Sequence, residues 1–338
     1  MSAVVIDWLG RGGIAQTTPA WVDGLRAAGH DTIVVTRGGR ELAGPNVIAP
    51  SEAVHPILTH RRVAALAAAT ILEREPDLVV VQNYVLPPLE APLDRAIRRT
   101  GTRSIVVMHD HRLHSPLAGT RAGLRRRLDH AELVVTHSRF VAEAVAAFAG
   151  RPDIASVALP LPTDLINRLP GHCVLPETTD ATALLFGIVK RRYKGIDVVR
   201  DLAAEGVAGW RFAAAGVGAP TTTPGIVGVS GFLPAADLVA TVASARAAVL
   251  PYRIASQSAA VVLAQSLGTI PVATAVGGIP EQITSGVDGI LVPEGASVDE
   301  WRHALQSIPE ALDDLGPAAV ARVHAADRAF RELVDGLV

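Results

Sequence analysis

Short runs of apolar residues recur along the first half of the chain, and each is followed by a segment with helical spacing of apolar and polar positions. Runs of this length are typical of strands buried on both faces. Such strands, alternating with helices, form parallel sheets. The strands expected in this half are Ala3–Ile6, Thr32–Thr36, Asp77–Gln82, Arg103–Met108 and Leu133–Thr136.

The same alternation starts again at Ala183, after an irregular proline-containing segment between Leu159 and Pro170. A segment rich in proline and without a period of its own is typical of a linker between domains. The expected strands of this half are Ala183–Ile188, Trp210–Ala214, Gly225–Val229, Ala247–Leu250 and Ile270–Ala275. The helices between them are Ile196–Ala203, Ala235–Ala243 and Ser258–Leu267.

The pattern predicts two Rossmann-like, doubly wound α/β domains, residues 1–165 and 166–316. A chain of 338 residues is long enough for two cores of ordinary size. The last helical segment, Pro317–Leu337, has a length suited to a return across the first domain. We therefore expect residues 317–338 to pack on that domain.

The composition narrows the class of protein. With 49% hydrophobic and 19% charged residues and a net charge of −2, the chain indicates a globular protein without affinity for nucleic acid. One cysteine, Cys173, excludes an intramolecular disulfide. The N-terminus lacks the features of a signal peptide, and no apolar run is long enough to span a membrane. We expect a soluble cytoplasmic protein, while its oligomeric state stays open.

Two turns in the second half deliver helix N-termini to the carboxyl edge of the expected sheet. There, free backbone N–H groups and the helix dipole favour an anion. Ser256 and Ser258 can cap the first of these helices, and Gly277 and Gly278 allow close approach of the backbone at the second. Ordinary capping and turning is the alternative, because such turns occur in most doubly wound proteins.

A cluster of cations lies on the loop after the first strand of the second half. Between Gly187 and Gly195 the sequence places Lys190, Arg191, Arg192 and Lys194. At the carboxyl edge of a sheet, we interpret this run as a clamp for a diphosphate rather than a solvated surface.

Two features of the first half fall at the corresponding edge. The loop after the first strand, Arg11–Pro19, carries Gly12 and Gly13 and is expected to be a glycine-rich turn leading into a helix. The strand Arg103–Met108 is followed by HDHRLH, which begins with His109. His109 is either a ligand-facing group or a loop histidine that caps the strand.

Several motifs, in order, resemble one family. They are FGIVKRRYKGIDVV, AAAGVG, VSGFLPAADLV and LPYRIASQSAAVVLAQSLGTIPVATAVGGIPEQITSGVDGILVP, preceded by GGIAQTTPAWVDGLRAAGHDTIVVT. Together they look like the family-four retaining glycosyltransferases of the GT-B fold. The resemblance implies two Rossmann-like domains facing across a cleft, a nucleotide-sugar donor held mainly by the second and a small-molecule or glycan acceptor held mainly by the first. It implies a hexosyltransferase that uses a UDP or GDP sugar.

The resemblance also assigns roles. The family's basic pair falls on Arg191 and Lys194, with Lys190 as a less favoured stand-in for the first, and the family's histidine falls on His109. Cations and helix N-termini would stabilise the departing diphosphate without a metal, in keeping with the absence of an Asp-x-Asp pair from the sequence. We therefore expect no metal and no cofactor. His111 and His114 are expected to be structural or solvent-facing.

The chain departs from the family at a pair of glutamates that usually contact the donor sugar and the ribose. Their places fall on Ser256 and Ala264, or on Ala255 and Leu263, none of which is a carboxylate. The sequence resembles a subgroup with a Ser-Gln-Ser turn. The donor-binding candidates are Gly12, Gly13, Gly187, Ser256, Gln257, Ser258, Gln265, Gly277, Gly278 and Glu281, with Gln265 as a substitute for the ribose contact.

Two other functions stay open. The missing glutamates favour a non-catalytic homologue that binds a nucleotide sugar or a partner enzyme as an auxiliary subunit. A nucleotide-sugar epimerase is the weaker alternative, because it shares the fold and also breaks a sugar–diphosphate bond. The retained Arg191, Lys194 and His109 favour the transferase.

Overall fold

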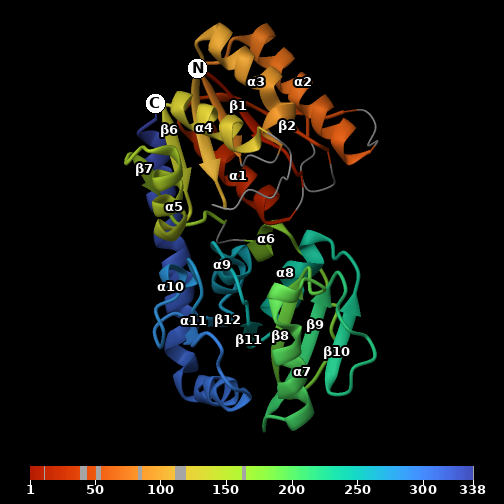
Figure 1. Ribbon diagram of the computed structural model, residues 1–338. Coiled ribbons are helices and arrows are strands. Elements are labelled where there is room, and N and C mark those ends of the chain that lie inside the picture. The colour runs from red at the N-terminus through yellow and green to blue at the C-terminus, as the bar shows by residue number, and fades with distance from the viewer. Residues whose placement is uncertain are drawn as a thin grey trace. The chain divides into compact units, whose positions relative to one another are not determined.

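The computed structural model describes residues 1–10, 12–38, 44–50, 55–82, 86–110, 119–161 and 165–337. Contacts within the chain define two compact units (Figure 1). Unit 1 contains residues 1–160 together with 328–338, and unit 2 contains residues 161–327. The division falls five residues before the expected boundary at 165/166. Expected roles as acceptor and donor domains stay predictions.

Unit 1 is built on a parallel sheet in the order β3-β2-β1-β4-β5-β6-β7. Its strands are β1 (Ser2–Asp7), β2 (Asp31–Thr36), β3 (Val47–Ile48), β4 (Leu78–Gln82), β5 (Arg103–Met108), β6 (Leu133–Thr136) and β7 (Ile154–Ser156). Its helices are α1 (Gly12–Ala27), α2 (Pro56–Arg74), α3 (Pro87–Thr100), α4 (Thr120–His130) and α5 (Arg139–Ala149). All five expected strands are therefore present.

Successive residues of a strand point to opposite sides of the sheet. Both faces are buried because helices pack on each side. Val4 and Ile6 pack with the apolar stripes of α2 and α3, whereas Ala3 and Val5 pack with α1. The end of the last helix, α11 (Val298–Asp335), completes the second face, where Phe330 lies edge-on to Trp21 with ring centroids 4.9 Å apart. The end of the chain thus belongs to the core of unit 1.

Unit 2 has a second parallel sheet in the order β10-β9-β8-β11-β12-β13. Its strands are β8 (Ala181–Gly187), β9 (Trp210–Gly216), β10 (Ile226–Ser230), β11 (Ala247–Leu250), β12 (Ile270–Thr274) and β13 (Ile290–Val292). Its helices are α6 (Leu165–Arg168), the 3-10 turn η1 (Arg192–Lys194), α7 (Ile196–Glu205), α8 (Ala235–Ala243), α9 (Ala259–Ser266), α10 (Ile279–Gln282) and the first part of α11. The expected βαβα unit is confirmed as β11-α9-β12-α10.

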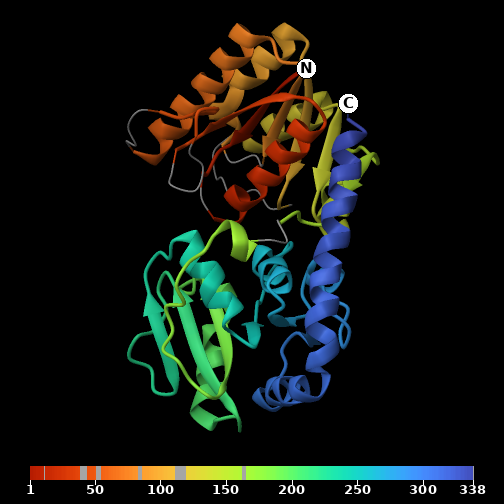
Figure 2. The same cartoon turned by 180° about the vertical axis from the view of Figure 1, so that it is seen from behind.

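Two expected element boundaries are wrong. The segment expected to be a glycine-rich turn is helical from Gly12 onward, because the first turn of a helix tolerates glycine and the stripe of α1 packs into the core. The last helix does not begin at Pro317 but at Val298. It is part of the blue, C-terminal end of the chain in Figure 2. Proline is favoured in a first helical turn, but buried residues on both sides of Pro317, such as Leu315 and Ala319, keep one helix continuous.

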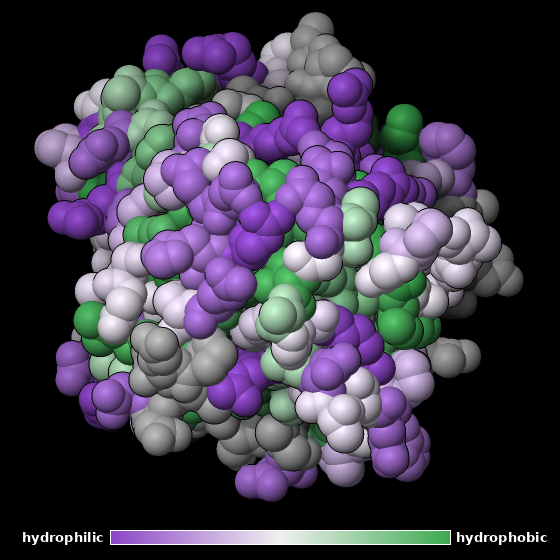
Figure 3. All heavy atoms as spheres, turned by 90° about the horizontal axis from the view of Figure 1, so that it is seen from below, coloured by the Kyte–Doolittle hydropathy of each residue, from purple (hydrophilic) through white to green (hydrophobic). Residues whose placement is uncertain are grey.

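None of the helices in the described part of the chain is both long enough and apolar enough to cross a membrane. On the face drawn in Figure 3, hydrophilic side chains predominate, and hydrophobic ones lie between them in small groups.

Candidate functional site

The loops that carry the candidate donor-binding residues of unit 2 meet at one edge of its sheet. Strands β8, β11 and β12 are neighbours and run parallel, so the loops that follow them emerge at the same carboxyl edge. Two backbone hydrogen bonds join these loops. Arg253 donates to the Tyr193 carbonyl at 2.8 Å, and Gly278 donates to the Ala255 carbonyl at 3.3 Å. The structure therefore brings together three segments that are far apart in the sequence.

The basic loop is held close to the end of β11 by glycine. Gly195 has a φ of 69°, and a Cβ atom there would lie 2.0 Å from the Pro251 carbonyl oxygen. At the other end of the loop, Gly187 has a φ of 98°, which also favours glycine. These two residues let the chain turn sharply between β8 and α7 while it carries the cations.

Lys194 lies against an aromatic side chain that the sequence analysis did not single out. Its Nζ is 2.5 Å from the Tyr252 hydroxyl and 4.0 Å from the centroid of the Tyr252 ring. Tyr252 is buried, so the ammonium group is oriented by a fixed partner. The signal for Tyr252 was its position two residues after the end of β11, in LPYR.

The other cations of the loop lie in solvent. Arg191 immediately precedes η1, and its side chain is exposed, as are those of Lys190 and Arg192. At the start of α7, Asp197 forms an ion pair with Arg253 that ties the helix to the loop after β11. An exposed guanidinium on an anchored loop can contact an anion at low cost in rearrangement.

Ser258 is the N-cap of α9. Its Oγ accepts a hydrogen bond from the Val261 N–H at 3.3 Å, and its own backbone groups are bound by the side chain of Gln282. The capping expected from the sequence is therefore present. Gln282 was missed, although it directly follows Glu281 in GGIPEQ.

Gln257 differs from its neighbours in the turn. Its side-chain Oε1 is buried and has no hydrogen-bond partner among the described residues. A buried amide oxygen without a partner costs free energy, which a ligand with an N–H or O–H group would recover. Ser256, beside it, is half-buried and makes contacts of its own.

Gln265 is placed inside the unit rather than at its surface. It is 1% exposed, and its Nε2 donates to the carbonyl oxygens of Gln282 and Asp288. This burial is an argument against the expected contact with the ribose, which stays a prediction. The hydrogen bonds instead make Gln265 an internal tie between α9 and α10.

The glycines and Glu281 lie at the third loop. Gly277 is exposed with a φ of 55°. Gly278 caps α10, and its N–H donates to the Ala255 carbonyl. Glu281 is half-buried, and its carbonyl accepts a hydrogen bond from Arg322 of α11 at 3.2 Å. Arg322 also pairs with Asp288 at 2.6 Å, so α11 holds the end of this loop.

In unit 1, His109 directly follows β5 and is 7% exposed. Its Nε2 lies 3.3 Å from Gln82 Oε1, and its ring is 4.9 Å from that of His137. Burial, reinforced by His137, holds the pKa of His109 well below its ordinary value. Gly12 and Gly13 form the first turn of α1 in the same unit. His111 and His114 lie outside the described residues.

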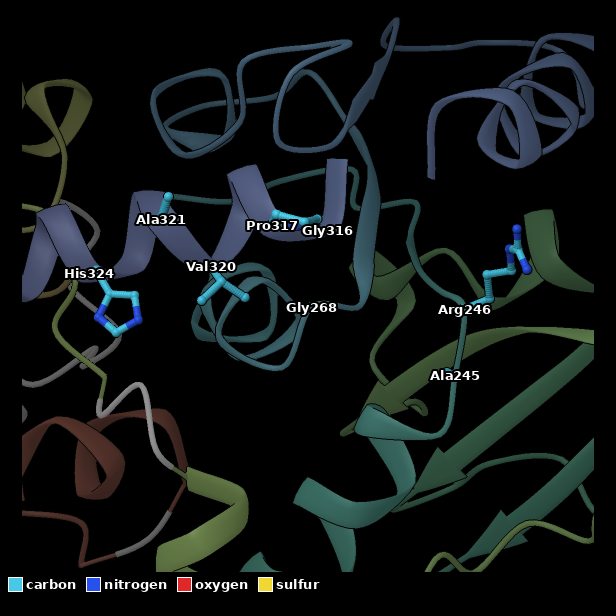
Figure 4. Close-up of a pocket in the computed structure, with 8 residues that line it drawn as sticks. All are labelled: Ala245, Arg246, Gly268, Gly316, Pro317, Val320, Ala321 and His324. Atoms are coloured by element: carbon cyan, nitrogen blue, oxygen red, sulfur yellow. The ribbon is translucent and has the colours of Figure 1, made fainter. Parts of the chain in front are cut away.

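A separate pocket of about 700 Å³ opens at the opposite, amino edge of the unit 2 sheet. Figure 4 shows Arg246 and Gly268, which precede β11 and β12, together with residues of α11 such as Val320 and His324. It contains none of the candidate site residues, so we do not assign the donor to it.

Comparison with known proteins identifies the family. Residues 11–165 match the model of Glycosyltransferase Family 4, and residues 181–310 match the model of Glycosyl transferases group 1. The chain belongs to these glycosyltransferases. One match lies mostly in unit 1 and the other lies in unit 2, where it includes β8 to α10 with all three loops of the candidate site.

Solved structures show that this family member has the GT-B fold. A glycosyltransferase from Rickettsia africae superposes with a TM-score of 0.73 at 14% identity, covering 99% of this chain and 98% of that one. Sucrose-phosphate synthase from Thermosynechococcus elongatus gives 0.72 at 17% identity, covering 100% and 98%. Anabaena HepE in complex with UDP-glucose gives 0.70 at 15% identity, again covering 100% and 98%.

Sequence relatives of this family member match over shorter stretches. D-inositol 3-phosphate glycosyltransferase of Mycolicibacterium smegmatis is 38% identical over 107 residues, which is 31% of this chain and 21% of that protein. The protein of the same name from a Mycobacterium species is 39% identical over 93 residues, 27% of this chain and 20% of the relative. The matched stretch is thus about a fifth of the length of these relatives.

Proposed function

We propose that this chain is a retaining glycosyltransferase that transfers a sugar from a nucleoside-diphosphate sugar, with UDP or GDP as the nucleotide, to an acceptor hydroxyl without a metal. The observation that carries the proposal is the convergence of the three loops after β8, β11 and β12. They combine the cations Arg191 and Lys194, the N-terminus of α9 and the unpartnered Oε1 of Gln257.

This arrangement suits a leaving diphosphate. As the bond between sugar and diphosphate breaks, negative charge builds up on the phosphate oxygens. Preorganised cations and backbone N–H groups stabilise that charge more than they stabilise the bound donor, so they lower the barrier. Lys194, oriented on Tyr252, and Arg191 would supply the charge. Gln257 and the capped turn would hold the sugar or the phosphates where other family members use a glutamate.

Unit 1 would hold the acceptor, with His109 as its contribution to the reacting centre. A buried, neutral imidazole acts as a hydrogen-bond partner for a hydroxyl group rather than as a fixed charge. The expected cytoplasmic location rests on the sequence alone and belongs to the same proposal.

The relatives support the choice of a nucleotide sugar. The Anabaena HepE structures hold UDP-glucose, or UDP and glucose, and the mycobacterial relatives are named for glycosyl transfer to D-inositol 3-phosphate. These names put UDP first among the nucleotides to test. They do not extend to the acceptor of this chain.

A non-catalytic homologue is the competing function, because neither expected glutamate position holds a carboxylate. Thermal-shift measurements with UDP, GDP, ADP and TDP come first, since a ligand at a hundredfold its dissociation constant stabilises by about 2.7 kcal/mol. We expect one nucleotide to stabilise the wild type and to lose this effect in Arg191→Ala. No stabilisation by any of the four would contradict donor binding.

Turnover then separates the functions. The sugar of the preferred nucleotide is incubated with a panel of hydroxyl acceptors, and the anomeric configuration of the product is read by NMR. Retention of configuration supports the proposal, and inversion would overturn its stereochemistry. Binding without transfer or donor breakdown favours the auxiliary subunit. Conversion of the donor without any acceptor identifies an epimerase.

A further inference from the structure

A chain of buried hydrogen bonds crosses the carboxyl edge of the unit 1 sheet. Thr18 Oγ1 donates to Asp7 Oδ2 at 2.7 Å, Gln82 Nε2 donates to Thr18 Oγ1 at 2.8 Å, and Gln82 Oε1 lies 3.3 Å from His109 Nε2. Asp7, Thr18 and Gln82 are all 0% exposed. Asp7 and Gln82 are the last residues of β1 and β4, His109 directly follows β5, and Thr18 comes from α1.

Asp7 sets which group donates and which accepts in this series of hydrogen bonds. Its Oδ1 accepts hydrogen bonds from the N–H groups of Leu9 and Gly10, both at 2.9 Å, and its Oδ2 faces the Thr18 hydroxyl. A carboxylate that accepts three hydrogen bonds acts only as an acceptor. Thr18 therefore gives its single hydroxyl proton to Asp7, and its oxygen must accept from the neighbour on its other side.

That neighbour is Gln82, whose orientation follows. Because Thr18 can only accept from it, the Gln82 amide must turn its NH2 group toward Thr18 and its oxygen toward the other side. The oxygen already accepts a hydrogen bond from the Thr17 hydroxyl at 2.9 Å. A second hydrogen bond to the same oxygen needs a donor, so His109 must carry a proton on Nε2.

His137 is an uncharged neighbour of His109 at near-neutral pH. Its Nδ1 lies 3.2 Å from the Val157 carbonyl, which fixes a proton there, and its Nε2 is buried without a partner among the described residues. Burial lowers the pKa of His137 from 6.5 to about 4. The ring centroids of His137 and His109 are 4.9 Å apart, and an imidazole supplies no negative charge that would stabilise a protonated His109.

We propose that Gln82 is a positioning residue: oriented by Asp7 through Thr18, it fixes the proton of His109 on Nε2 and leaves Nδ1 as an acceptor for a hydroxyl of the bound substrate. The last step rests on the proposed transferase function. The tautomer itself does not, because it follows from hydrogen bonds within the ligand-free unit.

The tautomer can be measured directly. Long-range proton–nitrogen NMR spectra of the 15N-histidine-labelled protein distinguish the Nε2–H, Nδ1–H and doubly protonated forms, and His109→Asn identifies the His109 signals. In the wild type without substrate, we expect the neutral Nε2–H form throughout the near-neutral pH range. An Nδ1–H form, or a His109 that is protonated near neutral pH, would overturn the proposal.

Variants test the path. Gln82→Glu places a carboxylate against Nε2–H and should raise the pKa of His109 by about 1 to 3 units. Thr18→Val removes the group that orients Gln82, so a mixture of tautomers is expected. Thr17→Val is the matched control: it removes a hydrogen bond to the same Gln82 oxygen without removing the orientation, and should leave the tautomer unchanged.

The combinations are decisive. A wild-type His109 spectrum in both Gln82→Glu and Thr18→Val would show that Gln82 does not set the proton, as would equal effects of Thr17→Val and Thr18→Val. Thr18→Val tests the path even where Gln82→Glu does not fold. All spectra are recorded without donor or acceptor, so they test the tautomer separately from the activity. A protein with the expected tautomer but without transferase activity would refute the proposed function and leave the role of Gln82 standing.

Discussion

The side-chain amide of Gln282 binds both backbone groups of Ser258. Gln282 Oε1 accepts from the Ser258 N–H at 2.7 Å, and Gln282 Nε2 donates to the Ser258 carbonyl at 3.2 Å. Both residues are buried, so the pair anchors the turn that carries Gln257 to the last residue of α10. The shape of the turn after β11 therefore depends on a residue of α10, the short helix that follows β12.

The first prediction concerns this anchor. Gln282→Leu leaves the buried N–H of Ser258 without a partner and leaves its carbonyl with only the hydrogen bond from the Val262 N–H. The variant should therefore lower the free energy of unfolding by about 1–3 kcal/mol. Donor affinity should fall as well, because the turn loses its fixed shape. Chemical denaturation and calorimetry with the preferred nucleotide measure the two effects. Gln306→Leu makes the same change at an exposed position of α11 and should alter neither. If Gln282→Leu binds the nucleotide with unchanged affinity, this turn is not part of the donor site.

The second prediction tests the cations. Arg191→Ala or Lys194→Ala should reduce turnover about a hundredfold or more, because each removes a charge that stabilises the leaving diphosphate. Stability should change by only about 0.5 kcal/mol for the exposed Arg191. The control is Arg200→Ala, which removes an exposed cation from the next helix, α7. Steady-state kinetics decide: turnover like that of the wild type in both site variants would refute the clamp.

The third prediction is that activity survives EDTA. The motivation is the cationic loop together with the absence of an Asp-x-Asp pair from the sequence. Initial rates are compared before and after chelation and dialysis. Loss of activity that magnesium or manganese restores would mean that a metal holds the diphosphate, and the role given to Lys194 would be wrong.

The fourth prediction separates capping from binding at the Ser-Gln-Ser turn. Ser258→Ala removes an N-cap and should cost about 1 kcal/mol of stability. If the hydroxyl also contacts the donor, affinity falls by a further 1 to 3 kcal/mol, on the order of one lost hydrogen bond to a charged group. Ser256→Ala should affect affinity more than stability.

Unit 1 supplies the control for that experiment. Ser138 caps α5 in the same way, with its Oγ accepting from the Val141 N–H at 3.2 Å. Ser138→Ala should reproduce the stability loss and leave donor affinity alone. Suppose that Ser258→Ala loses stability but keeps its donor affinity, as expected for Ser138→Ala, and that Ser256→Ala also binds the donor normally. The turn would then have a structural role only and no contact with the donor.

The fifth prediction follows from the buried His137. Its pKa is about 4 in the folded protein and near 6.5 when exposed, so between these values the unfolded chain binds a proton that the folded chain does not. Stability is therefore lost as the pH falls through this window, by about 3 kcal/mol in total at about 1.4 kcal/mol per pKa unit. Urea denaturation at several pH values gives the free energy of unfolding, which should depend less steeply on pH in His137→Leu than in the wild type. His324→Gln, at an exposed position, should keep the wild-type slope.

The sequence by itself determined the two sheets and the place of the loops. Continuous apolar runs such as Leu133–Thr136 and Ala247–Leu250 coincide with strands, because a strand covered on both faces needs apolar residues at every position. The carboxyl edge of a parallel sheet then fixes where the basic loop and the serine turn must emerge. The cations Arg191 and Lys194 could be located without any knowledge of their neighbours.

Only the tertiary structure decided which polar groups meet. Gln282 and Ser258 are 24 residues apart, His109 and Gln82 are 27 apart, and Thr17 and Gln82 are 65 apart. The sequence analysis gave Gln265 as a candidate for the ribose contact, whereas in the fold its side chain is buried and donates to the Gln282 carbonyl. Local patterns report burial and backbone conformation, because these recur with the period of a helix or strand. A hydrogen bond between distant segments has no such period, since its geometry exists only when packing brings the two strand ends together.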